Sequence, residues 1–159
     1  MAQVLLAKMR AASDFTQTRA YFDTSGQTFR IDVWNKPVSP ATSGSWVTEG
    51  GTHNLSSGVT FGYGTLTSPP PNTQASLAQA PACRNDSGAS PGTGTAIANT
   101  ACIVFNSRGI PIVDSTGAPT ASDAIYISDG ATVYAVTIIA TGMASTWSTP
   151  LGSPSWTQR

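Results

Sequence analysis

CIVFNSRGIPIV, residues 102–113, places two apolar runs on either side of a polar break that contains glycine. Val, Ile and Phe suit a pleated, buried surface, and Asn-Ser-Arg-Gly supplies turn residues with a glycine that can take a positive φ. The stretch therefore predicts a β-hairpin. Further along, the apolar segments 124–127 and 132–139 flank a second turn signal, Ser-Asp-Gly-Ala. With a closing strand at 144–147, residues 102–147 predict a meander of about four strands.

Length and composition bound the possible functions. The chain has 159 residues, which is most simply one domain. Charged residues make up 10% of it and cancel to zero net charge. This balance provides no electrostatic attraction for nucleic acid or for an anionic membrane. Low charge with abundant Ser and Thr is typical of exported β-rich proteins.

The two cysteines, Cys83 and Cys102, are separated by a segment rich in Gly, Ser, Pro and Thr. We expect them to form a disulfide, which for a loop of about 20 residues contributes roughly 3 kcal/mol. Two cysteines and one histidine do not make a four-ligand zinc site without carboxylates, and no Cys-x-x-Cys redox motif is present. A disulfide indicates an oxidising compartment.

The N-terminal residues 2–22 lack Gly and Pro and predict a helix with two apolar stripes about 100° apart. We expect the stripe Leu5, Met9, Ala12, Thr16 and Ala20 to cover the domain's own sheet. The second stripe, predicted to face a neighbouring molecule, consists of Val4, Ala11, Phe15 and Phe22. One broad buried face, with Phe15 and Phe22 in the core, is the alternative.

The middle of the chain predicts strands and one long loop. Residues 28–34 alternate apolar with polar, so Phe29, Ile31 and Val33 should face inward and Arg30 and Asp32 outward. Segments 46–48 and 59–64 are shorter candidates. Residues 65–100, rich in Pro and Gly, predict an irregular surface loop. One helix followed by period-2 segments gives an α+β fold, with an N-terminal helix packed on antiparallel β-sheets.

Residues able to carry chemistry are scattered. His53 lies in a loop-like stretch with no Gly-x-Ser-x-Gly motif, and we expect no catalytic role for it. Asp123 and Asp129 are interpreted as turn residues at strand ends rather than as a calcium site. Arg108 is interpreted as a solvated turn side chain rather than as an anion-binding residue. We therefore expect neither an enzyme nor a bound cofactor or metal.

The order of these parts carries a resemblance to a known family. Residues 101–111, ACIVFNSRGIP, resemble the I-x-F-x-x-x-G-x-P/S segment of the GspH/FimT family of type II secretion and type IV pilus minor pilins. The segments IYISDG at 125–130 and VTIIATG at 136–142 are similar to that family's last strands. The resemblance implies a division at residue 22: residues 1–22 would be the C-terminal half of the pilin helix, and 23–159 a β-rich globular domain.

The function implied by the resemblance is a structural subunit of a type II secretion pseudopilus or a type IV pilus, located at the tip and active in starting assembly. Its partners would be other pilins or pseudopilins, contacted through the N-terminal helix. An upstream leader and an apolar helix with a glutamate near its start, which this chain lacks, would anchor the protein in the inner membrane. The domain would then lie in the periplasm or on an extracellular filament.

A binding module is the alternative function. It would be an exported adhesin or a DNA-capturing pilus tip that acts through loop 65–100. DNA capture needs clustered Lys or Arg side chains, and residues 103–158 contain only Arg108, which argues against nucleic acid as a partner. The native sequence upstream separates these functions, since Gly-Phe-Thr-x-x-Glu followed by about 20 apolar residues is typical of pilins.

Overall fold

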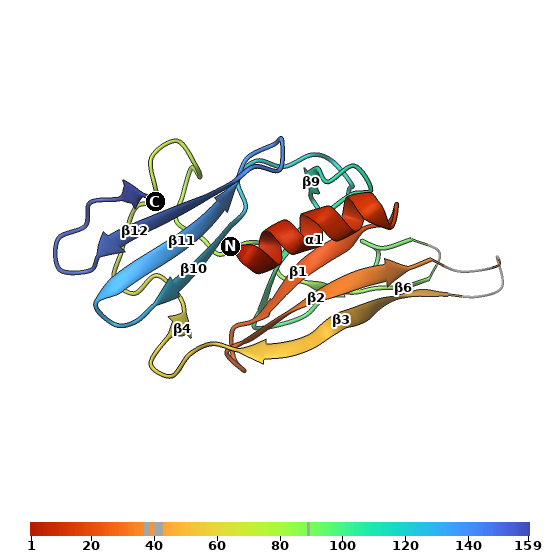
Figure 1. Cartoon of the computed structure of the whole chain (residues 1–159), viewed down its shortest axis with the longest axis horizontal. Coiled ribbons are helices and arrows are strands. Elements are labelled where there is room, and N and C mark those ends of the chain that lie inside the picture. Colours follow the sequence, from red (N-terminus) through yellow and green to blue (C-terminus); the bar gives the residue numbers. More distant parts are fainter. Residues whose placement is uncertain (37–38, 40–42, 89) are drawn as a thin grey trace.

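Two large antiparallel β-sheets, a two-stranded sheet of β5 and β7, and one short helix make up the described part of the protein (Figure 1). The computed structural model describes residues 1–36, 39, 43–88 and 90–159. The helix is α1 (Ala2–Ser13). The strands are β1 (Thr18–Asp23), β2 (Thr28–Asn35), β3 (Gly44–Asn54), β4 (Thr60–Phe61), β5 (Arg84–Asn85), β6 (Ser87–Gly88), β7 (Thr95–Ala96), β8 (Thr100–Phe105), β9 (Pro111–Ile112), β10 (Ala124–Ser128), β11 (Thr132–Ile138), β12 (Ala144–Pro150) and β13 (Thr157–Gln158).

The predicted α+β class is wrong, because the protein is mostly β, with 41% of its residues in strands and 8% in helix. The helix predicted over residues 2–22 ends at Ser13, and Thr18–Asp23 forms β1 instead. β-Branched and aromatic residues in this segment favour a strand. Both neighbours of β1 are long antiparallel strands, β2 and β8, so sheet hydrogen bonds replace the helical ones.

The end of α1 is fixed by local backbone geometry. The amide of Asp14 donates to the carbonyl of Arg10 at 3.0 Å, and the amide of Thr16 donates to the carbonyl of Ala11 at 3.3 Å. Between them, Phe15 takes a φ of 49°, in the left-handed region where glycine is usual. The chain therefore reverses immediately after the helix and enters β1.

The larger sheet has the order β6-β3-β2-β1-β8-β9. Its last pair is the predicted hairpin at 102–113, which the structure confirms. The turn is closed by the amide of Gly109, which donates to the carbonyl of Asn106 at 2.8 Å, and Gly109 has a φ of 70°. A side chain there would require a conformation that L-residues rarely adopt.

The second sheet has the order β13-β12-β11-β10-β4. β10 and β11 form the second predicted hairpin, in which Asp129 Oδ1 accepts the amides of Ala131 and Thr132 at 2.9 and 2.7 Å. The single meander predicted over 102–147 is wrong, however, because β8 and β9 belong to the larger sheet. The connection at 113–123 carries the chain from one sheet to the other.

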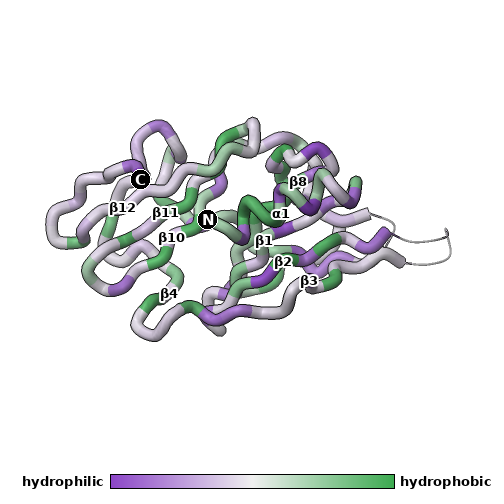
Figure 2. The backbone as a smooth tube through the Cα atoms, viewed as in Figure 1, coloured by the Kyte–Doolittle hydropathy of each residue, from purple (hydrophilic) through white to green (hydrophobic). Residues whose placement is uncertain are grey.

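The main core lies between the two sheets and beneath α1. Figure 1 shows α1 lying across the larger sheet, with its N-terminal end toward the second sheet. Residues from β1 and β8 meet residues from β10 and β11 there, and the core includes Phe22, Ile103, Phe105, Ile125 and Ile138. Figure 2 shows apolar residues along α1 and along strands of both sheets.

The first part of the long segment 65–100 packs on the second sheet through Leu66 and Leu77, and its later part, which includes Cys83 and Ile97, covers the face of the larger sheet opposite α1. The predicted disulfide between Cys83 and Cys102 is confirmed, and it joins this segment to β8. The amide of Cys102 donates to the carbonyl of Pro81 at 2.8 Å, and both cysteines are buried. This cover corrects the expectation for β2, because Asp32 is buried rather than facing solvent.

Candidate functional site

The helix α1 presents an apolar face to solvent. Leu6 is 42% exposed and Met9 is 65% exposed. Ala2 and Ser13 are exposed in line with them, at helical spacings of four, three and four residues, and Ala12 lies beside this row. Small isolated apolar residues are normal at a surface, but several on one helix face form a candidate contact area. We call Leu6 and Met9, with Ala2 and Ala12, the helix surface.

Within α1 the two predicted stripes are largely exchanged, whereas Thr16 and Ala20 of the sheet-facing stripe are buried but lie beyond the helix. Val4 and Ala11, which we expected to face a partner, are buried against the larger sheet together with Ala7. Phe22 is also buried, in β1. Met9, by contrast, was expected to cover the sheet and is exposed. Small residues explain the inversion, because Ala7 and Ala11 have no atoms beyond Cβ and allow the helix backbone to approach the strands closely.

Phe15 is the one predicted partner-facing residue that the structure leaves exposed, at 73% of its surface. Its positive φ and its exposed ring are both unfavourable for an isolated domain, since a left-handed conformation costs a non-glycine residue about 1 kcal/mol. Lys36 Nζ donates to its carbonyl oxygen and holds the turn in place. Phe15 therefore extends the apolar area beyond the C-terminal end of the helix surface.

A groove of about 760 Å³ opens between the two sheets at the N-terminal end of α1. Met1 and Val4 form part of one wall. Its other lining is mostly apolar and includes Phe22, Phe29, Leu55, Phe61, Ile127 and Trp147. Burial lowers the pKa of the Met1 amino group, which lies beside this groove. A space of this size and polarity is large enough to hold apolar side chains of another segment or a small apolar molecule.

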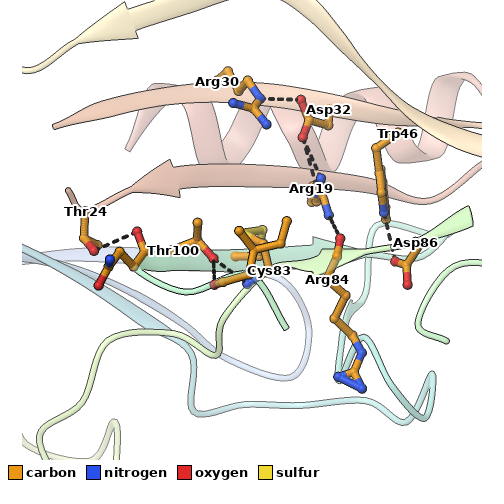
Figure 3. Close-up of a disulfide and its surroundings, with 12 residues drawn as sticks. Arg19, Thr24, Arg30, Asp32, Trp46, Cys83, Arg84, Asp86 and Thr100 are labelled. Carbon is orange, nitrogen blue, oxygen red and sulfur yellow. Dashed lines mark hydrogen bonds and ion pairs between the residues drawn. A yellow bond between two sulfur atoms is a disulfide. The ribbon is translucent and has the colours of Figure 1, made fainter. Parts of the chain in front are cut away.

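A buried charge cluster lies on the face of the larger sheet that is opposite α1 (Figure 3). Arg19 Nη2 lies 2.9 Å from Asp32 Oδ2, and their side chains are 4% and 1% exposed. Arg30 Nε lies 2.8 Å from Asp32 Oδ1, which also accepts the Thr48 hydroxyl at 2.9 Å. The Arg19 guanidinium stacks 4.3 Å from the centre of the Trp46 ring. Burial lowers the pKa of Arg19, and Asp32 opposes that shift.

The cluster attaches the long segment to the sheet. Arg19 Nη1 donates to the carbonyl of Arg84 at 2.8 Å, and Trp46 Nε1 donates to Asp86 Oδ2 at 2.9 Å (Figure 3). Asp86 also accepts the amide of Gly94 at 2.7 Å. The groups are engaged with one another and are buried or partly buried, so the cluster fits a structural role better than a catalytic one.

Asp114 lies near this cluster without a hydrogen bond. Both of its carboxylate oxygens are buried and have no hydrogen-bond partner among the described residues. Burial and the nearby Asp86 carboxylate together raise the pKa of Asp114 to about 6, against the opposing effect of Arg19 and Arg84. Asp123 is a separate buried carboxyl whose pKa burial also raises to about 6.

The other residues considered for chemistry lie apart. His53 stacks on Phe29, with 5.5 Å between ring centroids, on the exposed strand β3. Asp129 caps the β10–β11 turn, as interpreted from the sequence, and Arg108 is an exposed turn residue. Within residues 1–36, 39, 43–88 and 90–159, no three His, Cys, Asp or Glu side chains gather where a metal ion could bind. No helix in the described part of the chain has the length and apolarity needed to cross a membrane.

Sequence reasoning missed the charge cluster and the correct helix face. The cluster joins β1, β2, β3 and the long segment, so no local motif contains it. The end of the helix did have a signal, because Ser13 and Asp14 are followed by a stretch rich in Thr and aromatic residues.

Comparison with known proteins adds no relative: no family model, curated protein or solved structure matches this chain.

Proposed function

We propose that the chain is the globular part of a minor pilin or pseudopilin, a structural subunit of a type II secretion pseudopilus or a type IV pilus. It would join other subunits through its N-terminal helix. The protein would be anchored in the inner membrane by an upstream segment, and this domain would lie in the periplasm or on the filament. The disulfide Cys83–Cys102 supports an oxidising location of this kind.

The helix surface is the observation that carries the proposal. A helix that only covered its own sheet would be expected to present polar residues to water. In α1 the outward residues include Leu6 and Met9, while the sheet-facing residues Val4, Ala7 and Ala11 already complete the contact with the core. A second helix is a suitable partner, because a row of residues at spacings of four and three packs into the groove of another helix.

The inter-sheet groove gives further support. It begins beside Met1, so an apolar helical segment joined to residue 2 would pass along a wall that is already apolar. The resemblance of residues 101–111 to a minor-pilin segment is consistent with the same role. Loop 65–100, in contrast, contains one cation, Arg84, and offers little to a DNA-binding function.

Charge substitution on the helix surface tests the proposal. In the full-length protein with its cognate assembly proteins, Met9→Glu should reduce filament assembly or secretion at least about tenfold, because it places a charge in a desolvated helix contact. Met143→Glu is the matched control, since Met143 is 64% exposed but lies outside the helix. The control should assemble normally, and both isolated domains should stay folded.

Normal assembly by Met9→Glu would reject the helix surface as the contact. Equal losses in Met9→Glu and Met143→Glu would also reject it, because the effect would then not belong to the helix. The native gene provides an independent check: a prepilin-type leader followed by about 20 apolar residues is expected upstream, and its absence would contradict the proposal.

A further inference from the structure

The strand β3 leaves most of its outer edge unpaired. β6 pairs only with Gly44 and Ser45 of this strand. Among the described residues, no strand pairs with the outer edge of 46–54. Alternate residues of an antiparallel strand direct their N–H and C=O groups away from the neighbouring strand. A row of such groups at the surface can pair with a strand of another chain.

At several other places along the sheets, a side chain or a loop occupies positions that a neighbouring strand would take. At β10, the Gln79 side chain takes the place of a neighbouring strand: its Oε1 accepts the Tyr126 amide at 2.9 Å, and its Nε2 donates to the Tyr126 carbonyl at 2.8 Å. At β9 the chain folds back, so that Ile112 bridges to Pro119. β13 pairs with the middle of β12. Among the described residues, the Gln79 contacts and the Ile112–Pro119 bridge have no counterpart along residues 46–54 of β3.

The backbone of this edge is held in place from one side. Trp46 Nε1 donates to Asp86 Oδ2 at 2.9 Å, and the Thr48 hydroxyl donates to Asp32 Oδ1 at 2.9 Å. The regular part of the edge ends at Gly50, which has a φ of 73° and follows Glu49, the last residue in register before the bulge. Residues 46–49 thus form a short, fixed strand that would lose little conformational freedom on binding.

A groove of about 490 Å³ lies beside this segment on the helix side of the sheet. Val47, 49% exposed, provides an apolar contact within it. Its charged lining is Asp14, Glu49 and Lys36, two carboxylates against one ammonium group. Glu49 also pairs with Arg10, which is not part of the lining. With Glu49 paired to Arg10 and Lys36 Nζ donating to the carbonyl of Phe15, Asp14 is the carboxylate of this groove without an ion pair among the described residues, and a basic side chain would match it.

We propose that residues 46–49 of β3, the docking edge, bind an extended peptide segment of a partner protein. Backbone hydrogen bonds would add the segment to the larger sheet as a further strand. One apolar side chain would cover Val47, and one basic side chain would enter the adjacent groove toward Asp14. The docking edge is distinct from the helix surface, and it does not depend on the proposed assembly role.

A defined peptide tests the docking edge on the 159-residue chain. The probe is the acetylated and amidated hexapeptide Thr-Val-Thr-Lys-Val-Thr, titrated into ¹⁵N-labelled protein. We expect saturable binding with Kd on the order of 1 mM or tighter, with shift changes and slowed amide exchange centred on residues 46–49. Methylating the backbone nitrogens of alternate residues, in both possible phases, should weaken binding at least about tenfold in one phase, because it removes the donors that face β3.

Matched variants assign the binding to this edge. Val47→Lys should abolish binding by placing a cation against the basic peptide, whereas Val113→Lys, at a similarly exposed valine on the β9 side, should bind like the wild type. Replacing the peptide's Lys with Glu should weaken binding if Asp14 and Glu49 contribute as described.

Several results would overturn the docking edge. These are an absence of saturable binding, unchanged affinity after methylation in both phases, shift changes that map to the inter-sheet groove, and unaltered binding by Val47→Lys. A concentration-dependent dimer that protects the same amides and excludes the peptide would assign the edge to a second copy of the chain instead. None of these measurements involves filament assembly, so they can fail independently of the helix-surface experiment.

Discussion

Glutamate substitution at two adjacent alanines of α1 distinguishes its buried face from its exposed face. Ala11 is fully buried against the sheet, whereas Ala12 is exposed. Ala11→Glu must bury a carboxylate without a partner or move the helix away from the sheet, and we expect a loss of at least about 3 kcal/mol in unfolding free energy. Ala12→Glu should change it by less than about 0.5 kcal/mol. Both variants replace Ala by Glu within α1 and so change the helix propensity equally. The difference between their unfolding free energies therefore measures the burial of position 11.

Urea unfolding followed by tryptophan fluorescence measures this difference, since the chain has four Trp residues. In thermal unfolding, about 3 kcal/mol corresponds to a decrease of about 6–12 °C in Tm for a domain of this size. The loss in Ala11→Glu should be smaller at pH 4 than at pH 8, because protonation removes the buried charge. Unfolding free energies within about 0.5 kcal/mol of each other would refute the assignment of the helix faces.

Three further predictions concern the covered side of the larger sheet. Replacing Cys83 and Cys102 together by serine should lower the unfolding free energy by about 3 kcal/mol, measured by urea unfolding without reductant. Arg19→Ala should cost about 3–5 kcal/mol in the same measurement, because Asp32 stays buried with less compensation, and a loss below about 1 kcal/mol would contradict the buried ion pair. Asp114 has a folded-state pKa of about 6, above its usual value, so its ionisation should reduce stability as the pH rises from about 4 to about 6. Asp114→Asn should therefore gain about 1 kcal/mol relative to the wild type between pH 4 and pH 8, and a pH-independent difference would contradict the raised pKa.

The two hairpins could be predicted from the sequence because their information is local. Gly109 supplies the positive φ of the first turn, and Asp129 accepts the amides of the second. The disulfide could also be predicted, since Cys83 and Cys102 are the two cysteines of the chain. In each case a few adjacent residues, or a pair with no alternative partner, determine the contact.

The helix boundary and the orientation of the helix could not be predicted from periodicity. The apolar residues of α1 surround much of its circumference, so spacing alone does not select the buried stripe. The sheet selects Ala7 and Ala11 because close approach of backbones requires small side chains there. β1 likewise forms because β2 and β8 are present to pair with it, and those strands lie further along the chain.

The charge cluster depends on contacts between distant segments. Asp32 lies between the apolar residues Ile31 and Val33 in the strand pattern. If only one face of the strand were buried, Asp32 would therefore face solvent. The structure instead covers it with residues that include Arg84, about fifty positions later. Because a strand pattern states which residues share a face, but not whether that face is covered, the burial of Asp32 follows only from the whole fold.

The Gln79 side-chain amide beside β10 limits how copies of this protein could pair through their strands. One side chain supplies the donor and the acceptor that a neighbouring strand would supply, so β10 is closed to other chains at Tyr126. A strand added at the docking edge therefore leaves β10 occupied at Tyr126, so the next copy could not repeat the step by pairing its β3 with β10. Growth of a fibril by successive β3-to-β10 pairing is thereby blocked at Tyr126.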